Sequence, residues 1–171
     1  MDIKVKEINV PVSAYLADVK GGDISENQDV QRKFCADNSF VDGIAVTLLN
    51  GGYLPPIVLG EIPYTDGIVQ QYIVDGMQRT AAMRIIRYGN HKFSRTMEDA
   101  EIEYQEKKRD EHGKVMKQED GSIEWERKIF KLSGKTFDEL PNELKKRFDM
   151  FQVRIVIHPN CAMKEISKLV R

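Results

Sequence analysis

A segment near the middle of the chain joins an apolar strand to a helix through an Asp-Gly turn. It runs from Tyr72 to Arg84 with the sequence YIVDGMQRTAAMR. The apolar run before the turn is typical of a strand, and the spacing of apolar residues after it is typical of a helix. This strand-turn-helix junction limits the fold to one that combines strands with helices, and we expect an α+β domain.

The residues of the turn are suited to binding an anion. Gly76 lets the backbone come close to a ligand, and the first N–H groups of a helix lack partners within the helix. The helix dipole favours negative charge at the same place. Arg79 adds a planar fork of donors that matches a phosphate group. The pattern therefore predicts a phosphate site at this junction.

A purely structural interpretation fits the same residues. Asp75 would cap the helix, Gly76 would be a turn glycine, and Arg79 would pair with Asp75 one turn back. Both interpretations stay open at this point.

The rest of the chain predicts a small number of further elements. We expect a strand over 3–10, largely irregular chain over 11–37, and a helix capped by Ser39 that ends at Gly51-Gly52. Strands are expected over 56–62 and 70–75. The helix after Asp75 is expected to end near Gly89 and to bury Ala81, Ala82, Ile85 and Ile86.

The period of the sequence changes after residue 98. Ile102 and Tyr104 alternate with acids, and Ile123 and Trp125 alternate with polar residues in the same way. Such alternation predicts an antiparallel hairpin, inserted on the core over about 98–132. After it, Pro141 is expected in the first turn of a short helix, and an apolar strand is expected over 151–157.

The order of these segments resembles a known superfamily. Gln31-Arg32 precedes a helical pattern, Pro55-Pro56-Ile57 opens a strand, Asp75-Gly76-Met77-Gln78-Arg79 follows the next strand, and Phe137-Asp138-Glu139-Leu140-Pro141 comes later. This arrangement resembles the ParB/sulfiredoxin-like superfamily. Within it, the chain is most similar to the DGQQR domains of GmrSD-type modification-dependent restriction enzymes and SspE-like phage-defence proteins. Met77 stands where that branch carries its first glutamine.

The resemblance implies a single domain over residues 1–171, with a small mixed sheet and flanking helices, and the hairpin over about 98–132 is expected as an insertion on that core. It also implies binding of a nucleoside triphosphate, with or without hydrolysis, in a regulatory role in DNA processing or in defence against foreign DNA. A nuclease effector domain or protein is the partner that it implies. The nucleotide-binding residues implied are Gln31, Arg32, Asp75, Gly76, Gln78, Arg79 and Thr80.

The hypothesis assigns a role to each group at the turn. The N–H groups after Gly76 and the guanidinium of Arg79 hold phosphates, and Arg32 closes over them. Asp75 either orients Arg79 or holds Mg²⁺ through water, because Mg²⁺ is commonly shared between a carboxylate and substrate phosphates. Gln78 positions an attacking water. Asp75, Gln78 and Arg79 are therefore the candidate catalytic residues.

A stretch of positive charge suggests a second hypothesis. Between Arg79 and Arg95 every full charge is positive, whereas 98–126 carries eleven acids against five bases. The first stretch predicts either a solvated helix face or a DNA-binding surface of a non-catalytic module. A metal-dependent nuclease ranks lower, because only one acid is certain to lie at the turn. The candidate nucleic-acid contacts are Arg84, Arg87, Lys92 and Arg95.

Composition is consistent with a single, soluble, cytoplasmic domain. The chain has 171 residues, 41% of them hydrophobic, and a formal net charge of −1, which is enough apolar content for one core. It contains no apolar run long enough to span a membrane. The two cysteines, Cys35 and Cys161, are far apart in sequence, so neither a zinc site nor a disulfide framework is indicated.

The end of the chain carries an apolar stripe at helical spacing. We expect a helix from about residue 162, with Met163, Ile166, Leu169 and Val170 on one face. In the resembling family this helix continues into a larger helical region, so we expect either a truncated piece or a short stand-alone relative. A helix this short is marginal in water by itself, so it must dock on this domain, on a second copy or on a following domain.

The docking of this stripe can be tested with Ile166→Asp. If the stripe packs on the domain or on a second copy, this change is expected to lower the melting temperature or to dissolve a homo-oligomer measured by light scattering. A variant that matches the parent in both measurements would indicate that the stripe awaits a following domain.

Overall fold

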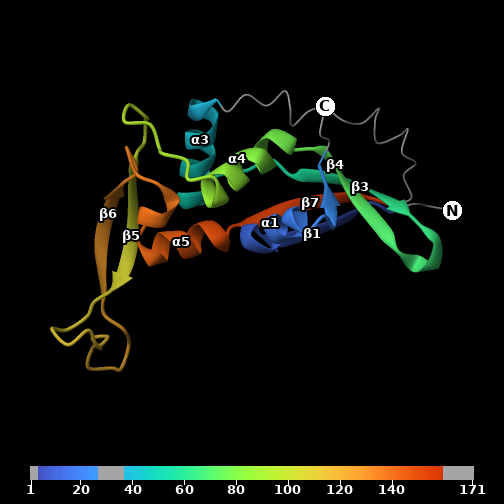
Figure 1. The fold of residues 1–171 in the computed structure, drawn as a ribbon. Coiled ribbons are helices and arrows are strands. Elements are labelled where there is room, and N and C mark those ends of the chain that lie inside the picture. The colour runs from blue at the N-terminus through green and yellow to red at the C-terminus, as the bar shows by residue number, and fades with distance from the viewer. Residues whose placement is uncertain (1–3, 27–36, 160–171) are drawn as a thin grey trace.

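A computed structural model describes residues 4–26 and 37–159 of the chain (Figure 1). Residues 1–3, 27–36 and 160–171 lie outside the described residues. The predicted nucleotide contacts Gln31 and Arg32 fall in the second of these segments, and the predicted helix from about 162 falls in the third.

A five-stranded mixed sheet forms the centre of the fold. Its order is β1(Lys6–Pro11), β7(Gln152–His158), β3(Ile57–Pro63), β4(Val69–Asp75) and β2(Ile24–Ser25). The pairs β1–β7 and β3–β4 are antiparallel, whereas β7–β3 and β4–β2 are parallel. Together with the helices, this mixed sheet confirms the expected α+β class and the strands expected near 56–62 and 70–75.

One face of the sheet is packed against helices. The alternate residues Ile57 and Leu59 on β3, and Val153, Ile155 and Ile157 on β7, are buried in one core cluster. This alternation is what a strand with one buried face requires. The core therefore lies between the sheet and the helices α1(Val12–Lys20), α3(Asn38–Leu49), α4(Met77–Tyr88) and α5(Asn142–Asp149).

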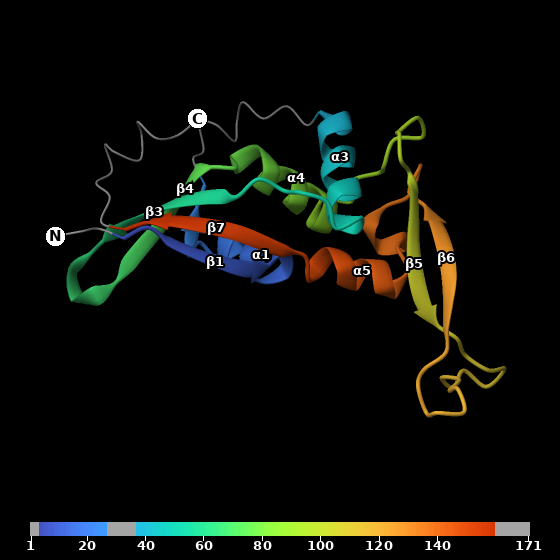
Figure 2. The ribbon, with the colours of Figure 1, turned by 180° about the vertical axis from the view of Figure 1, so that it is seen from behind.

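The helices α3 and α5 connect the sheet to a second, smaller one. Figures 1 and 2 show them between the main sheet and the hairpin of β5(Glu101–Lys107) and β6(Trp125–Lys131). Short 3-10 turns cover Thr65–Gly67 and Phe137–Glu139. The hairpin thus lies at the far end of the molecule from the main sheet, with α3 and α5 between the two.

The structure corrects the expectation that residues 11–37 are largely irregular. Helix α1 occupies the first part of this range, and it buries Val12, Tyr15, Leu16 and Val19. These positions have helical spacing, so the helix is amphipathic. Pro11 precedes the helix and Gly21 ends it, and this punctuation over so few residues made the segment look like a loop.

The expected cap of the next helix is also wrong. The N-cap of α3 is Asp37, whose carboxylate accepts a hydrogen bond of 3.0 Å from the backbone N–H of Ser39. Aspartate and serine are both good N-caps. Asp37 supplies the acceptor for a free N–H group at the start of the helix, and Ser39 lies inside the first turn.

The antiparallel hairpin expected over 98–132 is confirmed. Ile102 and Tyr104 on β5 are buried, whereas Trp125 at the start of β6 is about half-exposed. Besides these buried side chains, Arg147 ties the hairpin to the helices, because its Nη1 donates to the backbone oxygens of Leu49 at 2.8 Å and Glu103 at 3.0 Å.

Gly76 joins β4 to α4 and is required there for two reasons. Its φ of 105° lies in the left-handed region, which favours glycine. A Cβ at this position would also lie 2.5 Å from Cδ1 of Ile57. The chain can therefore turn from strand to helix here only because the residue has no side chain.

We predict that Gly76→Ala destabilises the fold by about 2 to 4 kcal/mol, because backbone strain and overpacking act together. Chemical denaturation would measure the free energy of unfolding. Gly22→Ala is the matched control, since Gly22 also has a positive φ of 84° but open space around it. It should cost about 1 kcal/mol, the strain contribution alone.

A second substitution separates the energetic cost of the clash with Ile57 from the cost of backbone strain at Gly76. Ile57→Val removes Cδ1, so Gly76→Ala should cost less in that background than in the parent. Equal costs in the two backgrounds would show that the contact with Ile57 does not restrict this position.

Candidate functional site at the start of helix α4

No side chain of residues 4–26 or 37–159 caps the first turn of α4. The residue at the cap position is Gly76, and the first hydrogen bond of the helix runs from the N–H of Thr80 to the oxygen of Gly76 at 2.9 Å. Asp75 precedes the cap position, so the structural interpretation in which it caps the helix is wrong. A helix start of this kind attracts negative charge.

Arg79 is held by the backbone of a neighbouring strand segment. Its Nη2 donates to the oxygen of Pro56 at 2.8 Å and lies 3.9 Å from Oδ2 of Asp75. The side chain is only 18% exposed. Its Nε is buried and has no hydrogen-bond partner among the described residues. The expected ion pair with Asp75 is thus present but long, and one donor of the guanidinium remains unused.

The structure brings three of the predicted site residues together on the surface. Asp75 has a side chain that is 47% exposed, and Gln78 is exposed in the first turn of the helix. Both belong, with Arg79, to the junction of β4 and α4, whose course Figure 1 shows. An anion in solution can approach this junction from the side of Gln78.

Thr80 supports the turn from inside the protein. Its hydroxyl donates to the oxygen of Gly76 at 2.9 Å, and it is fully buried. Because this donation uses its only hydrogen, the hydroxyl of Tyr15 must be the donor in the 2.9 Å bond between Tyr15 and Thr80. The Thr80 side chain therefore does not face the surface where the sequence places a nucleotide.

Burial keeps Tyr15 in its neutral form. Its side chain is completely enclosed, and this desolvation raises the pKa of the phenol well above its usual value. Tyr15 therefore acts as a structural hydrogen-bond donor beneath the turn.

The predicted basic surface is partly neutralised. Arg84 forms an ion pair with Glu26, and Arg87 donates to both carboxylate oxygens of Asp149 at 2.9 and 3.4 Å. Lys92 and Arg95 are exposed in the segment that follows α4. The four residues therefore do not form one surface of free cations.

The described residues, 4–26 and 37–159, contain no group of three or more His, Cys, Asp or Glu side chains that could hold a metal ion. The turn itself offers one carboxylate, that of Asp75. In the same residues no helix is long and apolar enough to cross a membrane.

A buried polar pair that the sequence did not indicate lies near the end of α4. Nε2 of His91 is 2.8 Å from Oδ1 of Asp42, and both side chains are buried. The N–H of Ser94 donates to Oδ2 of the same aspartate at 3.3 Å. The pair fastens the segment after α4 to α3. No local sequence pattern predicts this pair, because His91 and Asp42 are 49 residues apart in the chain.

Comparisons of the chain with models of protein families, with curated proteins and with solved structures found no match.

We predict that the bond between Tyr15 and Thr80 stabilises the turn. Thr80→Val leaves the buried Tyr15 hydroxyl without a partner and should cost about 1 to 3 kcal/mol, whereas Tyr15→Phe should cost about 0.5 to 1.5 kcal/mol. The double variant should cost less than the sum, since it leaves no orphaned donor. Urea denaturation measures all three variants, and strictly additive costs would contradict the bond.

Proposed function

We propose that this chain is a nucleotide-binding domain of the ParB/sulfiredoxin-like type, and that it binds a nucleoside triphosphate at the start of α4. The observation that carries the proposal is the buried Nε of Arg79, for which the described residues offer no acceptor, beside a helix start that no described side chain caps. The resemblance of the Asp75–Arg79 segment to the DGQQR motif supports a triphosphate as the anion.

The unused donor of Arg79 favours an anionic ligand. A buried donor without a partner costs about 1 to 3 kcal/mol, and a phosphate that drew the guanidinium outward would supply the missing acceptor. The phosphate would at the same time lie at the positive end of the α4 dipole. Arginine suits this role because its fork of donors binds phosphate in a bidentate manner.

Because of Asp75, binding of the triphosphate is expected to depend on Mg²⁺. In the free protein its carboxylate lies 3.9 Å from Arg79 and offsets part of that charge. A triphosphate beside an exposed carboxylate would be repelled unless a cation lay between them. Mg²⁺ bound to the phosphates and reached by Asp75 through water satisfies both groups. Hydrolysis would then depend on Gln78, the exposed amide that can orient a water.

The geometry favours this function over the DNA-binding module suggested by the charge of α4. Two of the four predicted contacts, Arg84 and Arg87, are already engaged with acids of the same chain. Separating these pairs would oppose binding of a phosphate backbone on this face.

We predict that at least one of ATP, CTP, GTP and UTP with Mg²⁺ raises the melting temperature. A ligand at 100 to 1,000 times its Kd stabilises the fold by roughly 3 to 4 kcal/mol. Arg79→Ala should weaken binding about tenfold or more, because it removes a charge-assisted contact of about 1.5 to 3 kcal/mol.

Arg79→Ala also removes the hydrogen bond to Pro56 and can therefore destabilise the fold. A second variant tests phosphate binding without removing that bond. Gln78→Glu adds an acid to the first turn of α4, which favours the helix but repels phosphate. It should bind the triphosphate more weakly without losing stability. Gln118→Glu, at an exposed position between β5 and β6, is the matched control. If no triphosphate changes the melting temperature, or if Gln78→Glu binds as the parent does, the proposal is wrong.

A further inference from the structure

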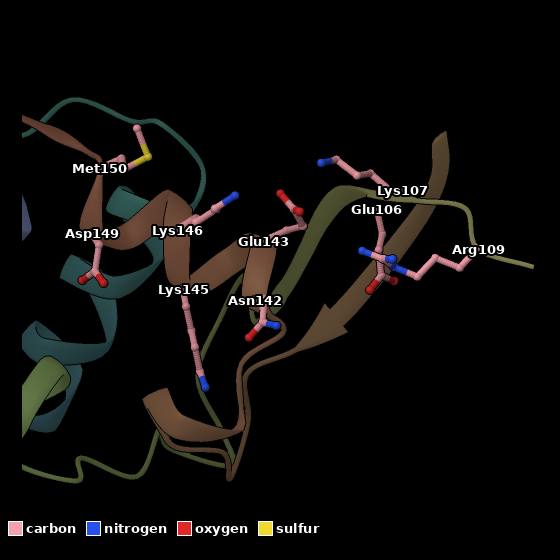
Figure 3. Close-up of a pocket in the computed structure, with 9 residues that line it drawn as sticks. All are labelled: Glu106, Lys107, Arg109, Asn142, Glu143, Lys145, Lys146, Asp149 and Met150. Atoms are coloured by element: carbon pink, nitrogen blue, oxygen red, sulfur yellow. The ribbon is translucent and has the colours of Figure 1, made fainter. Parts of the chain in front are cut away.

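Two adjoining hollows lie between the β5–β6 hairpin and α5, and we call them together the hairpin groove. Their volumes are about 560 Å³ and 390 Å³. Both are lined by Glu143, Lys146 and Met150, so they form one continuous surface. Figure 3 shows the larger hollow, with α5 on one side and the end of β5 on the other. No residue of the Asp-Gly turn lines either hollow.

The hairpin groove carries an excess of positive charge. Of its three acids, Glu106 is paired with Lys128 at 2.7 Å and Asp149 with Arg87 at 2.9 Å, which leaves Glu143. Five basic residues line the groove: Lys107, Arg109, Lys145, Lys146 and Arg147. Among the described residues, no carboxylate lies within 4.0 Å of any of these five side-chain charges.

The charges lie on more than one side of α5. In Figure 3 the side chains of Lys107 and Lys146 extend toward the side on which Glu143 lies, whereas Lys145 points away from them. Arg147 is occupied by two backbone oxygens. Lys107 and Lys146 are therefore the cations best placed for one extended ligand.

An exposed indole lies beside these cations. Trp125 is the only tryptophan of the chain and is 49% exposed. It is the direct cross-strand partner of Lys107, whose Nζ lies 5.9 Å from the centre of the ring. Met150, 65% exposed, lies in the same hollow as Trp125. A large aromatic side chain at this position leaves apolar area in water that a ligand can cover.

We propose that the hairpin groove binds single-stranded nucleic acid, with a base stacked on Trp125 and phosphates held by Lys107 and Lys146. Aromatic rings next to lysines are how sequence-tolerant proteins hold single strands. A duplex keeps its base faces covered, and an acidic peptide offers charge without a base to stack. This inference is independent of the triphosphate site, because the two surfaces share no residue.

The experiment is a fluorescence titration of the full chain with a fifteen-residue oligothymidylate. Since Trp125 is the only indole, stacking should quench the emission directly. Affinity should fall with added salt, because bound lysines release counterions from the strand. Absence of quenching and of binding at low salt would overturn the proposal.

Variants measured with a labelled oligonucleotide assign the contacts. Trp125→Leu should weaken binding about 5- to 100-fold through lost stacking. Lys107→Gln with Lys146→Gln should weaken it about tenfold and lower the salt slope by about 1.4, the value for two phosphates on a single strand. These side chains lie at the surface, and an unchanged melting temperature confirms that the variants fold.

The matched control is Lys92→Gln with Arg95→Gln, which removes the same charge from the segment after α4. It should bind as the parent does. If this control weakens binding instead, the nucleic acid binds along α4 and the segment after it, and the proposal fails. Full competition by a glutamate-rich peptide at equal charge concentration would likewise overturn it in favour of an acidic protein partner.

Discussion

The close contact between Gly76 and Ile57 determines how the helices sit on the sheet. It brings the first turn of α4 against the start of β3, and the bond from Arg79 to Pro56 fastens the same two segments. Thr80, one turn into the helix, then connects this junction to Tyr15 on α1. The sheet, α4 and α1 therefore meet at one point. The solvent-facing start of α4 is fastened there by the buried contacts of Gly76, Arg79 and Thr80.

Sequence patterns predicted the elements that have a strong period and clear ends. The strands β3 and β4, helix α4 and the hairpin all carry such patterns, and the structure contains them. Helix α1 was missed although Val12, Tyr15, Leu16 and Val19 have helical spacing. Its short length between Pro11 and two glycines gives the local signal of a loop, and only packing against the core decides in favour of the helix.

The site was predictable to the extent that it is local. Asp75, Gln78 and Arg79 follow one another along the chain, so a motif can place them together. The burial of Thr80 and the ion pair of Arg87 depend on Tyr15 and Asp149, which are 65 and 62 residues away. The charge of the hairpin groove has the same origin, since it emerges only when distant acids are paired with other bases. A linear pattern of charges does not contain that information.

The pairing of β1 with β7 has a consequence for how the protein is made. Lys6 lies opposite Ile157 in this ladder, so the first described strand has its only sheet neighbour near the far end of the chain. During synthesis the hairpin of β3 and β4 and the helix α4 leave the ribosome long before β7 does. The sheet closes only when this late strand enters between β1 and β3. Contacts of such long sequence separation slow folding, and one backbone edge of β3 stays unpaired until β7 arrives.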